Sequence, residues 1–260
     1  MQLKNKNVII TGASSGIGYD LMVLLLERGA TVIASSRKIS LTDIEHPNLY
    51  KYDCDMSCKE GIDKLLSFAL KKFEHIDAFI ANAGFAYYGK TGSAWEDMQK
   101  IYCTNVLSSI YAATKLKEIS GKKPYNFMIT ASAMAFVSLP GYALYSSTKS
   151  ALRGFADAYR YELEKGQHLQ MVYPIATITK FFDNAGGIPM AWPRQSSKKV
   201  AKTMLKSLEK NKANTYPSKI FVLFKCLSGI CPLFTRIYMN TYNKVLYKWL
   251  KNKDNDKKEE

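Results

Sequence analysis

Short apolar runs rich in β-branched residues alternate along the chain with longer segments in which apolar positions recur every three or four residues. The short runs predict buried strands, and the longer segments predict amphipathic helices packed on a sheet. Strands are expected at 7–11, 31–36, 49–53, 77–81, 125–131 and 168–173. Helices are expected at 16–28, 59–73, 95–119, 145–165 and 196–210. This alternation predicts an α/β fold with a doubly wound, mostly parallel sheet.

The 260 residues suffice for one large core, and no repeat or low-complexity linker divides them before the last ten. We expect a single domain: a main body over 1–214, an amphipathic helical extension over 215–250 and a disordered charged tail over 251–260. The opening MQLKNKN leads straight into the first predicted strand and shows no signal peptide. Five cysteines form no even framework and no C-x-x-C pair, so we expect reduced thiols, no metal site and a cytoplasmic protein.

The first predicted strand, NVIIT, is followed by the glycine-rich turn GASSGIG and then by a predicted helix. Glycines let the backbone approach a pyrophosphate closely, and the amides at a helix start favour its negative charge. A strand, a glycine turn and a helix in this order are the context that a dinucleotide-binding motif requires. The spacing is G-x-x-x-G-x-G, and an ordinary βα turn is the alternative interpretation.

Tyr145 and Lys149 stand four residues apart in a predicted helix, thirteen residues after Ser132. At this spacing two side chains share a helix face, and an ammonium beside a phenol is expected to lower the pKa of the tyrosine. Ser132 follows an apolar run and offers a hydroxyl for a substrate oxygen. The three residues together would form a complete proton-transfer site for carbonyl or alcohol chemistry. The alternative is an ordinary helix surface, where Tyr and Lys often occur at this spacing without a function.

Several motifs occur together in the expected order. Residues 11–18 read TGASSGIG and match a T-G-x-x-x-G-x-G element, and residues 82–84 read NAG after the fourth predicted strand. With the Y-x-x-x-K pair, these residues resemble the short-chain dehydrogenase/reductase family over 7 to about 180. The resemblance implies a Rossmann-type fold and a catalytic set of Asn105, Ser132, Tyr145 and Lys149.

The second predicted strand ends in TVIASSRK, where a carboxylate would accept bonds from the ribose hydroxyls of NAD and repel a 2′-phosphate. Ser36 takes that place and Arg37 follows it, so the resemblance implies NADP, with Lys38 nearby; a solvated arginine is the alternative. The expected cofactor contacts are Gly12, Ser14, Ser15, Gly16, Ile17, Gly18, Arg37, Asp55, Asn82, Ala83, Gly84, Tyr145, Lys149, Pro174, Thr177 and Thr179.

Two of these contacts carry an alternative or a departure from the family pattern. Asp55 resembles the family acid that contacts adenine, and it is equally typical of a turn or helix start. The segment PIATIT resembles the family element P-G-x-x-x-T, with Ile175 in the place of the glycine. A β-branched residue does not readily adopt positive φ, so we expect the backbone to run differently there.

The resemblance implies an NADP(H)-dependent oxidoreductase that interconverts a ketone or aldehyde and an alcohol. Ser132 and Tyr145 would hold the substrate oxygen, and Tyr145 would transfer the proton. Lys149 would bind the nicotinamide ribose, and Asn105 would hold a water that relays protons to it. The alternatives are a non-catalytic NADP(H)-binding regulatory protein and a reductase of small soluble carbonyls.

The C-terminal region is strongly basic. Residues 184–250 contain twelve Lys or Arg and one acid, which accounts for +11 of the net charge of +15. The apolar run 220–231 is too short to span a bilayer. Beyond it, one helical face collects Leu233, Phe234, Ile237, Tyr238, Tyr242, Val245, Leu246, Trp249 and Leu250, with basic residues opposite.

This amphipathic pattern over 220–250 is typical of a segment lying on a membrane, and also of a helix packed on its own domain or on another subunit. The basic residues lie among aromatic ones and in no nucleic-acid-binding motif, so no nucleic acid partner is expected. The extension resembles the 11β-hydroxysteroid dehydrogenase and retinol dehydrogenase-like branch. That resemblance implies a hydrophobic substrate that is steroid-, retinoid- or long-chain-like.

Residues 181–194 are expected to form a lid, with Gly186 and Gly187 supplying flexibility and Met190 and Trp192 an apolar inner surface. Family members pair through helices that correspond to 95–119 and 145–165. The resemblance therefore implies a homodimer or homotetramer.

Overall fold

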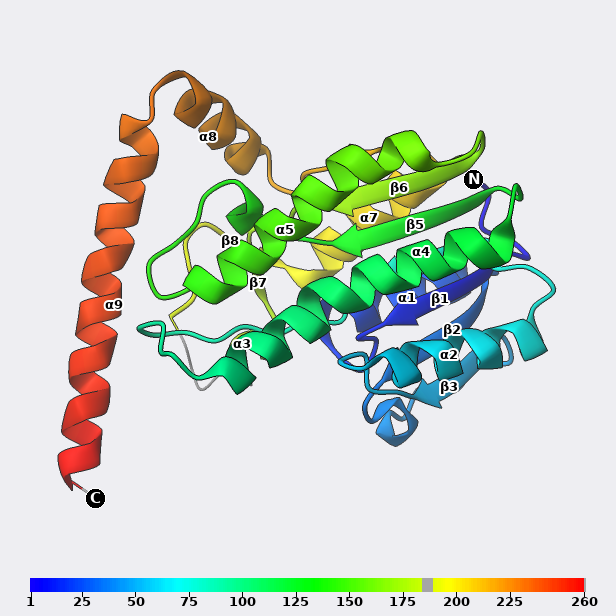
Figure 1. Ribbon diagram of the computed structural model, residues 1–260, viewed down its shortest axis with the longest axis horizontal. Helices are drawn as coiled ribbons and strands as arrows, with labels where there is room; N and C mark the ends of the chain where they lie inside the picture. The colour runs from blue at the N-terminus through cyan, green and yellow to red at the C-terminus, as the bar shows by residue number, and fades with distance from the viewer. Residues whose placement is uncertain (184–188, 260) are drawn as a thin grey trace.

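The computed structural model describes residues 1–183 and 189–259, and its parallel sheet carries helices on both faces (Figure 1). Within those residues the main sheet has seven parallel strands in the order β3-β2-β1-β4-β5-β6-β9. The strands are β1 (Asn7–Thr11), β2 (Thr31–Ser36), β3 (Leu49–Asp53), β4 (Ala78–Ala81), β5 (Tyr125–Thr130), β6 (Gln167–Val172) and β9 (Asn214–Thr215). The doubly wound α/β fold is confirmed.

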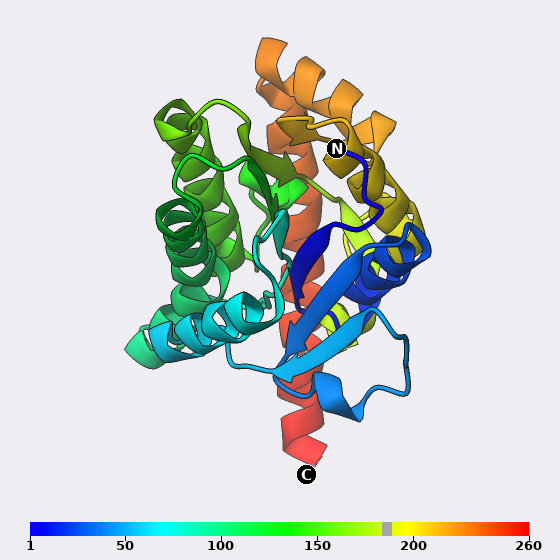
Figure 2. The same cartoon turned by 90° about the vertical axis from the view of Figure 1, so that its right-hand side faces the viewer.

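Helices cover the sheet in two layers (Figure 2). The helices are α1 (Gly16–Glu27), α2 (Lys59–Lys72), α3 (Trp95–Tyr102), α4 (Ser108–Ser120), α5 (Ala143–Tyr159), α6 (Lys180–Asp183), α7 (Ser197–Glu209), α8 (Lys219–Ile230) and α9 (Leu233–Glu259). Buried residues of α1 and α7 pack on one face of the sheet, and those of α2, α4 and α5 pack on the other. The periodic apolar positions of these helices are therefore the positions that face the strands.

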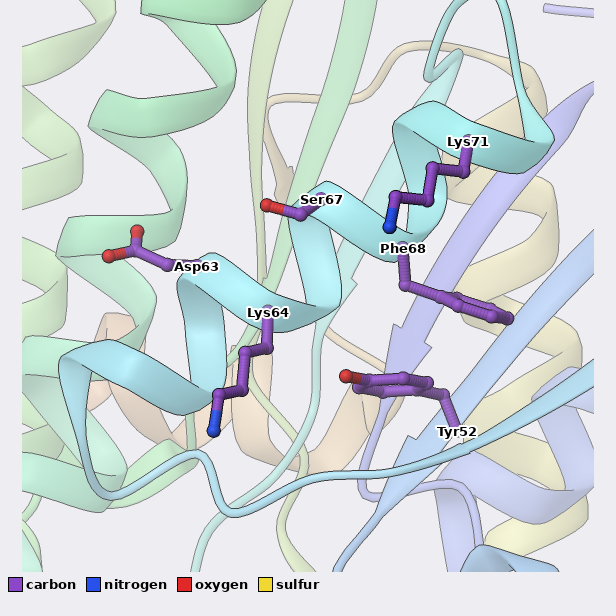
Figure 3. Close-up of a pocket in the computed structure, with 6 residues that line it drawn as sticks. All are labelled: Tyr52, Asp63, Lys64, Ser67, Phe68 and Lys71. Atoms are coloured by element: carbon purple, nitrogen blue, oxygen red, sulfur yellow. The ribbon is translucent and has the colours of Figure 1, made fainter.

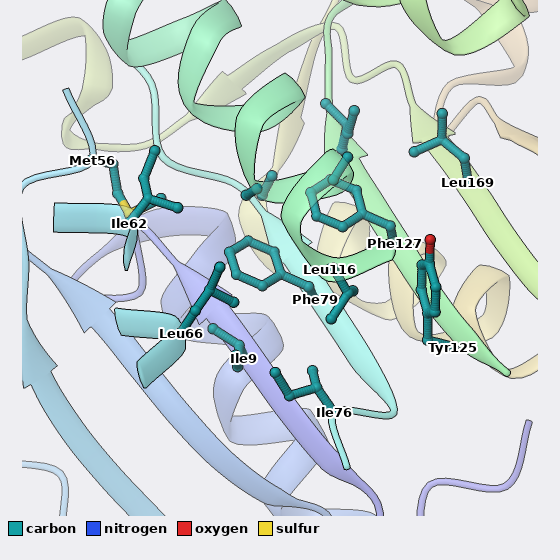
Figure 4. Packing of buried hydrophobic residues seen from close by; sticks show 14 of the residues in the cluster. Ile9, Met56, Ile62, Leu66, Ile76, Phe79, Leu116, Tyr125, Phe127 and Leu169 are labelled. Carbon is teal, nitrogen blue, oxygen red and sulfur yellow. The ribbon is translucent and has the colours of Figure 1, made fainter. Parts of the chain in front are cut away.

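Large apolar side chains pack between the centre of the sheet and the helices on one of its faces (Figure 4). Phe79 of β4 and Phe127 of β5 stack with ring centroids 5.1 Å apart. Leu66 of α2 and Leu116 of α4 belong to the same buried cluster. Full burial of such side chains stabilises the fold by about 1.5–3 kcal/mol each.

The order of the strands creates a crevice at one edge of the sheet. β1 pairs with β2 on one side and with β4 on the other. The connections that follow β1 and β4 therefore lead in opposite directions from the carboxyl edge. Ligands of open α/β sheets bind at this kind of switch point.

Several elements differ from the expectation. The helix expected over 95–119 is interrupted by a π-helical segment, Cys103–Leu107, which shifts the helical phase by a residue. The helix expected at 145–165 runs from Ala143 to Tyr159 and continues as a 3₁₀ turn, Arg160–Glu162. β7 (Ala176–Ile178) and β8 (Arg194–Ser196) form a separate parallel ribbon that was not expected. Like β9, these strands are too short to leave an apolar run.

The C-terminal extension forms α8 and the long helix α9, which continues to Glu259 where a disordered tail was expected. Lys and Glu are good helix formers, which favours this continuation. Within the part of the chain that the structure describes, no single helix is both long and apolar enough to cross a bilayer. Only the pair of α8 and α9 up to Lys253, bent by 116°, meets the length and composition criterion.

Candidate active site

The turn between β1 and α1 follows a path that requires glycine. Gly12 and Gly16 have φ of 65° and 59°, in the left-handed region. A Cβ on Gly18 would lie 2.2 Å from the carbonyl oxygen of Gly12. The first turn of α1 contains no acid, so nothing in that turn opposes an anion at the helix start. The turn thus fits the pyrophosphate of a dinucleotide.

A hydrogen-bond network holds this turn against the loop after β4. The Thr11 hydroxyl accepts from the backbone N–H groups of Asn82 and Ala83, at 3.1 and 3.2 Å. The Asn82 side-chain amide donates to the carbonyl oxygens of Thr11 and Gly12, both at 3.2 Å. These bonds tie the two loops of the crevice together, so Asn82 and Ala83 stabilise the glycine turn.

The other expected cofactor contacts follow β1, β2 and β3 at the carboxyl edge. Ser14, Ser15, Arg37 and Asp55 are all exposed there, and Ile17 is half-buried. A carboxylate does lie opposite Ser36, on Asp53 of the adjacent strand. Both oxygens of Asp53 accept hydrogen bonds from Ser40, and this bonding lowers the pKa of the carboxyl group. The residues at this edge fit a nicotinamide dinucleotide.

Asp55 and the segment after β6 show local bonding. The Asp55 carboxylate accepts from the Ser57 N–H at 2.8 Å, in the turn that the sequence left as an alternative. Within residues 1–183 and 189–259, the non-glycine residues with positive φ are Asn5 and Asn211. Ile175 therefore takes the place of the family glycine without an unusual backbone. The expectation of a different path at Ile175 finds no support in its φ.

The two threonines of this segment have different surroundings. Thr177 is buried, and its hydroxyl donates to the Ile175 carbonyl at 2.8 Å. Thr179 lies beside the glycine turn, because a Cβ on Gly16 would lie 2.8 Å from its methyl carbon. Pro174, which precedes both, is buried. Thr179 is thus the better placed of the two to contact a bound cofactor.

Ser132, Tyr145 and Lys149 come together where β5 ends and α5 begins. Ser132 is extended and buried, and its hydroxyl accepts from the Met134 N–H at 3.1 Å. The Lys149 ammonium lies 5.4 Å from the centroid of the Tyr145 ring, one helical turn away. It donates to the Thr130 carbonyl at 3.0 Å, which fixes the lysine to the sheet. The expected trio is therefore a spatial cluster.

Asn105 lies in the π-helical segment and is almost fully buried. Its side-chain oxygen accepts from the Phe85 N–H at 3.0 Å, and its amide donates to the Phe85 carbonyl and the Thr148 hydroxyl. A Cβ on Gly84 would lie 3.1 Å from the Asn105 oxygen and 3.7 Å from the Lys149 nitrogen. Asn105 thus joins the NAG loop to α5 beside the lysine.

Burial determines the protonation of the two titratable groups. It raises the pKa of Tyr145 to about 12, although hydrogen bonding with Ser132 opposes this. It lowers the pKa of Lys149 to about 8. The expectation that the tyrosine pKa is lowered is wrong, because desolvation outweighs the hydrogen bond with Ser132. At neutral pH the phenol keeps its proton and can donate it.

Lys149→Met is expected to stabilise the fold while it removes the ammonium. The folded-state pKa of about 8 lies below the ordinary value of 10.5, so the unfolded chain binds the proton more tightly. We expect a gain of about 2 kcal/mol near pH 7, since one pKa unit is about 1.4 kcal/mol and the lost bond to Thr130 costs about 1 kcal/mol. The gain should be full below pH 8 and shrink as the pH rises to 10.5. Urea unfolding across this range measures it, and a gain that grows with pH would contradict the assignment.

Aromatic rings extend from Tyr145 to the C-terminal helix. Tyr145 lies 6.3 Å from Tyr142 between ring centroids, Tyr142 lies 4.7 Å from Tyr88, and Tyr88 lies 4.9 Å from Trp249 of α9. Phe181 contacts Tyr145 on the other side, at 5.7 Å. We call this set the aromatic wall: Tyr88, Tyr142, Phe181, Tyr238, Tyr242 and Trp249.

The lid expected over 181–194 is attached to α9. The Tyr242 hydroxyl accepts from the Trp192 N–H, and the Tyr238 hydroxyl donates to the Trp192 carbonyl, both at 2.6 Å. Met190 packs against the aromatic wall as expected. Trp192 does not, because its side chain points to solvent and is 69% exposed. Gly186 and Gly187 lie outside the described residues.

Most residues of the aromatic wall lie outside the expected lid. Tyr88, Tyr142 and the aromatic residues of α9 had no assigned place beside the tyrosine. Their signal in the sequence is the apolar stripe over 233–250 and the aromatic pair in FAYYG. Only the fold brings the two segments together.

A separate surface hollow lies on α2 and beside the end of β3 (Figure 3). It measures about 300 Å³ and is lined by Tyr52, Asp63, Lys64, Ser67, Phe68 and Lys71. Tyr52 and Phe68 stack with centroids 4.6 Å apart. These lining residues include no member of the expected site.

Solved structures share this fold. A short chain dehydrogenase from Burkholderia cenocepacia, in complex with NADP, superimposes with a TM-score of 0.78 over 90% of this chain and 96% of that one, at 22% identity. A short chain dehydrogenase/reductase from Burkholderia phymatum, in complex with NAD, gives a TM-score of 0.76 over 88% and 94%, at 15% identity. At these identities the likeness shows the fold.

Sequence relatives and a family model agree with the motifs. The uncharacterized oxidoreductase Lin0452 of Listeria innocua is 29% identical over 197 residues, which cover 70% of this chain and 79% of the relative. The probable short-chain type dehydrogenase/reductase VdlC of Helicobacter pylori is 30% identical over 159 residues, which cover 60% and 59%. The family model for short chain dehydrogenase matches residues 6–186. Because that match spans well over half of the chain, this protein belongs to the short-chain dehydrogenase family of oxidoreductases.

Proposed function

We propose that the protein is an NADPH-dependent reductase of hydrophobic ketones or aldehydes. The observation that carries this proposal is the cluster of Ser132, Tyr145 and Lys149, which the Asn105 side chain joins to the glycine-rich edge. A donor phenol, a hydroxyl and an ammonium beside a dinucleotide turn are the groups that carbonyl reduction needs.

Each residue has a defined role in the proposed reaction. Bound NADPH would supply the hydride, and negative charge would develop on the carbonyl oxygen of the substrate. The hydroxyls of Ser132 and Tyr145 hold that oxygen, and Tyr145 donates its proton to it. A Tyr145 pKa of about 12 keeps the phenol protonated until this charge appears. Lys149 would bind the nicotinamide ribose and stabilise the phenolate, and Asn105 would order a water that returns a proton through Lys149.

The preference for NADP is proposed from the edge of β2. Arg37 is exposed directly after β2, and the one carboxylate opposite, Asp53, is held by Ser40. A guanidinium binds a 2′-phosphate with charge-assisted bonds, and no free acid at positions 36–38 repels it. Of the two solved structures described above, one is a complex with NADP and the other a complex with NAD. The preference for NADP is therefore proposed on Arg37.

Arg37→Ser is expected to raise the KM for NADPH about tenfold and to leave that for NADH unchanged. A bond to a charged group contributes about 1.5–3 kcal/mol, and exposure of the guanidinium to water favours the lower end. Initial rates with both cofactors measure the change. Lys122→Ser, an exposed cation before β5 at the opposite edge of the sheet, is the matched control and should change neither KM. Equal losses with NADH and NADPH would contradict a contact with the 2′-phosphate.

A hydrophobic substrate is proposed because Tyr145 packs in one apolar cluster with the aromatic wall and Met190. Apolar and aromatic lining with a few polar groups is typical of sites for apolar ligands. We therefore place steroid-, retinoid- or long-chain-like carbonyls before small soluble ones. The resemblance of the C-terminal extension to the 11β-hydroxysteroid dehydrogenase-like branch points the same way.

The deciding experiment follows the loss of NADPH absorbance with a panel of steroid, retinoid, long-chain and small soluble carbonyls. The proposal expects turnover that is fastest with a hydrophobic member and much slower with NADH. Fastest turnover of a small carbonyl would favour the reductase of soluble substrates. Tight NADPH binding without oxidation by any carbonyl would favour a regulatory protein.

The remaining proposals concern the oligomeric state and the location of the protein. A homodimer or homotetramer through the helices of 95–119 and 145–165 is proposed. The exposed apolar side chains of Leu107 in the π-helical segment and Ile119 of α4 support the first of these surfaces, and a monomer in light scattering would contradict the proposal. A cytoplasmic protein with a peripheral membrane contact through 220–250 is the proposed location.

A further inference from the structure

The turn that joins α8 to α9 carries an exposed apolar surface, which we call the elbow. Its members on α8 recur every three or four residues, and those on α9 belong to its first turns. The elbow consists of Ile220, Leu223, Leu227, Ile230, Leu233, Phe234 and Ile237, all of them exposed. Ile230, directly before the turn, is 84% exposed. Figure 1 shows the turn standing clear of the sheet and its covering helices.

These side chains are distinct from those that hold the two helices to the domain. α8 is anchored by the buried Phe221, and α9 by Tyr242, Leu246 and Trp249. The apolar stripe that suggested a membrane helix in the sequence thus packs largely on the protein itself. The elbow is the part that this packing leaves in water. A cluster of exposed large apolar side chains is typical of an interaction surface.

The chain on both sides of the elbow carries only positively charged side chains. From Lys210 to Lys253 the chain holds nine Lys or Arg and no acid. Leu233 and Ile237 were expected on the face opposite the basic residues, but at helical spacing they share the outward stripe of α9 with Lys244, Lys248 and Lys251. An apolar end and a row of ammonium groups on one stripe match a helix that lies along a membrane surface, with its apolar end among the acyl chains and its lysines against anionic headgroups.

We propose that the elbow docks this protein on a bilayer surface that carries anionic lipid headgroups. The apolar side chains enter the boundary between headgroups and acyl chains, and the lysines of the outward α9 stripe lie against the headgroups. This inference rests on the membrane contact proposed above and narrows it. The membrane contact proposed for the whole of 220–250 is thereby restricted to the elbow and one stripe of α9.

The docking is peripheral because α9 stays attached to the domain. Tyr238 and Tyr242 bond to the Trp192 backbone, and Trp249 packs on Tyr88. Insertion of α9 across the bilayer would break these contacts. It would also place its lysines in hydrocarbon, where charged side chains are costly.

Docking would bring the substrate site close to the lipid. The inner face of α9 belongs to the aromatic wall, while its first turns enter the membrane surface. A carbonyl compound dissolved in the bilayer would then reach the wall along α9 without crossing bulk water.

Cosedimentation with vesicles tests the proposal on the full-length protein. Vesicles of phosphatidylcholine alone are compared with vesicles that also contain phosphatidylserine. The wild type is expected to bind the anionic vesicles at least tenfold more tightly, and added salt should weaken this binding. The elbow variant Leu223→Ser/Ile230→Ser/Leu233→Ser should lose at least tenfold on both. Leu41→Ser, which changes an apolar side chain that is 73% exposed on another part of the surface, is the matched control.

A second variant tests the charged stripe. Lys244→Gln/Lys248→Gln should bind neutral vesicles like the wild type and lose its preference for phosphatidylserine. Deletion of 233–260 is a poor substitute, because it would remove only part of the elbow and would also uncover Tyr88 and Tyr142.

The outcomes separate docking from catalysis. NADPH oxidation with a water-soluble carbonyl should be unchanged in the elbow variant, which also shows that it folds. Vesicle binding without oxidation of any carbonyl would sink the proposed reaction and leave docking standing. Failure of the wild type to bind, or equal binding by the elbow variant, overturns docking. Self-association that the elbow variant abolishes, without vesicle binding, would assign the surface to a second copy of the chain.

Discussion

Tyr145→Phe is expected to lower kcat/KM for NADPH-dependent carbonyl reduction by about 100- to 10,000-fold, the usual contribution of a positioned acid. The change deletes one oxygen and leaves the ring, which packs against Tyr142 and Phe181. Cofactor affinity should therefore remain close to that of the wild type. Single-turnover rates with the best carbonyl of the panel, and NADPH fluorescence for binding, measure the two quantities.

The control for this variant lies three residues earlier. Tyr142→Phe removes a hydroxyl from the same aromatic wall, where it donates to the Pro189 carbonyl at 2.8 Å. Loss of that bond should weaken the lid and affect KM more than the rate of proton transfer. If both variants lose activity equally, the hydroxyl of Tyr145 has no special role and the proposed proton donor is wrong.

Gly18→Ala is expected to abolish dinucleotide binding at useful concentrations and to lower the free energy of unfolding by about 1–3 kcal/mol. The new Cβ would lie 2.2 Å from the Gly12 carbonyl oxygen and 2.6 Å from the Asn82 side-chain nitrogen. Because the first of these atoms is backbone, relief requires the whole glycine turn to move. Titration of NADPH fluorescence and urea unfolding report the two effects.

Gly154→Ala provides the matched control on α5. Nothing lies within 4 Å of a Cβ at this position. Alanine also suits a helix better than glycine, so this variant should bind NADPH normally and gain about 0.5–1 kcal/mol. Normal cofactor affinity in Gly18→Ala would show that the turn does not hold the cofactor.

The sequence was sufficient for six of the seven strands described in the main sheet, because runs such as NVIIT and TVIASS are apolar, short and bounded by turn residues. It also placed Ser132, Tyr145 and Lys149 in one cluster, since a strand end and one helical turn fix their relative positions. The π-helical segment around Asn105 was beyond reach, because apolar periodicity does not reveal one extra residue in a turn.

Other features depend on long-range packing. The pKa of Tyr145 is set by the groups that cover it, and the spacing to Lys149 could not show that burial dominates. The stripe over 233–250 was identified as apolar, but its main contacts with Tyr88 and the lid come from residues far away in the sequence. Trp192 was assigned to the inner surface by its character, whereas the lid is held through its backbone instead.

The attachment of α9 to the lid has a consequence for biosynthesis. The cluster of Ser132, Tyr145 and Lys149 depends on β5, α5 and the neighbouring β6. Tyr238, Tyr242 and Trp249, which complete the aromatic wall, are synthesised later than all three of these elements. During translation the reactive groups can therefore come together before the aromatic wall beside them is complete.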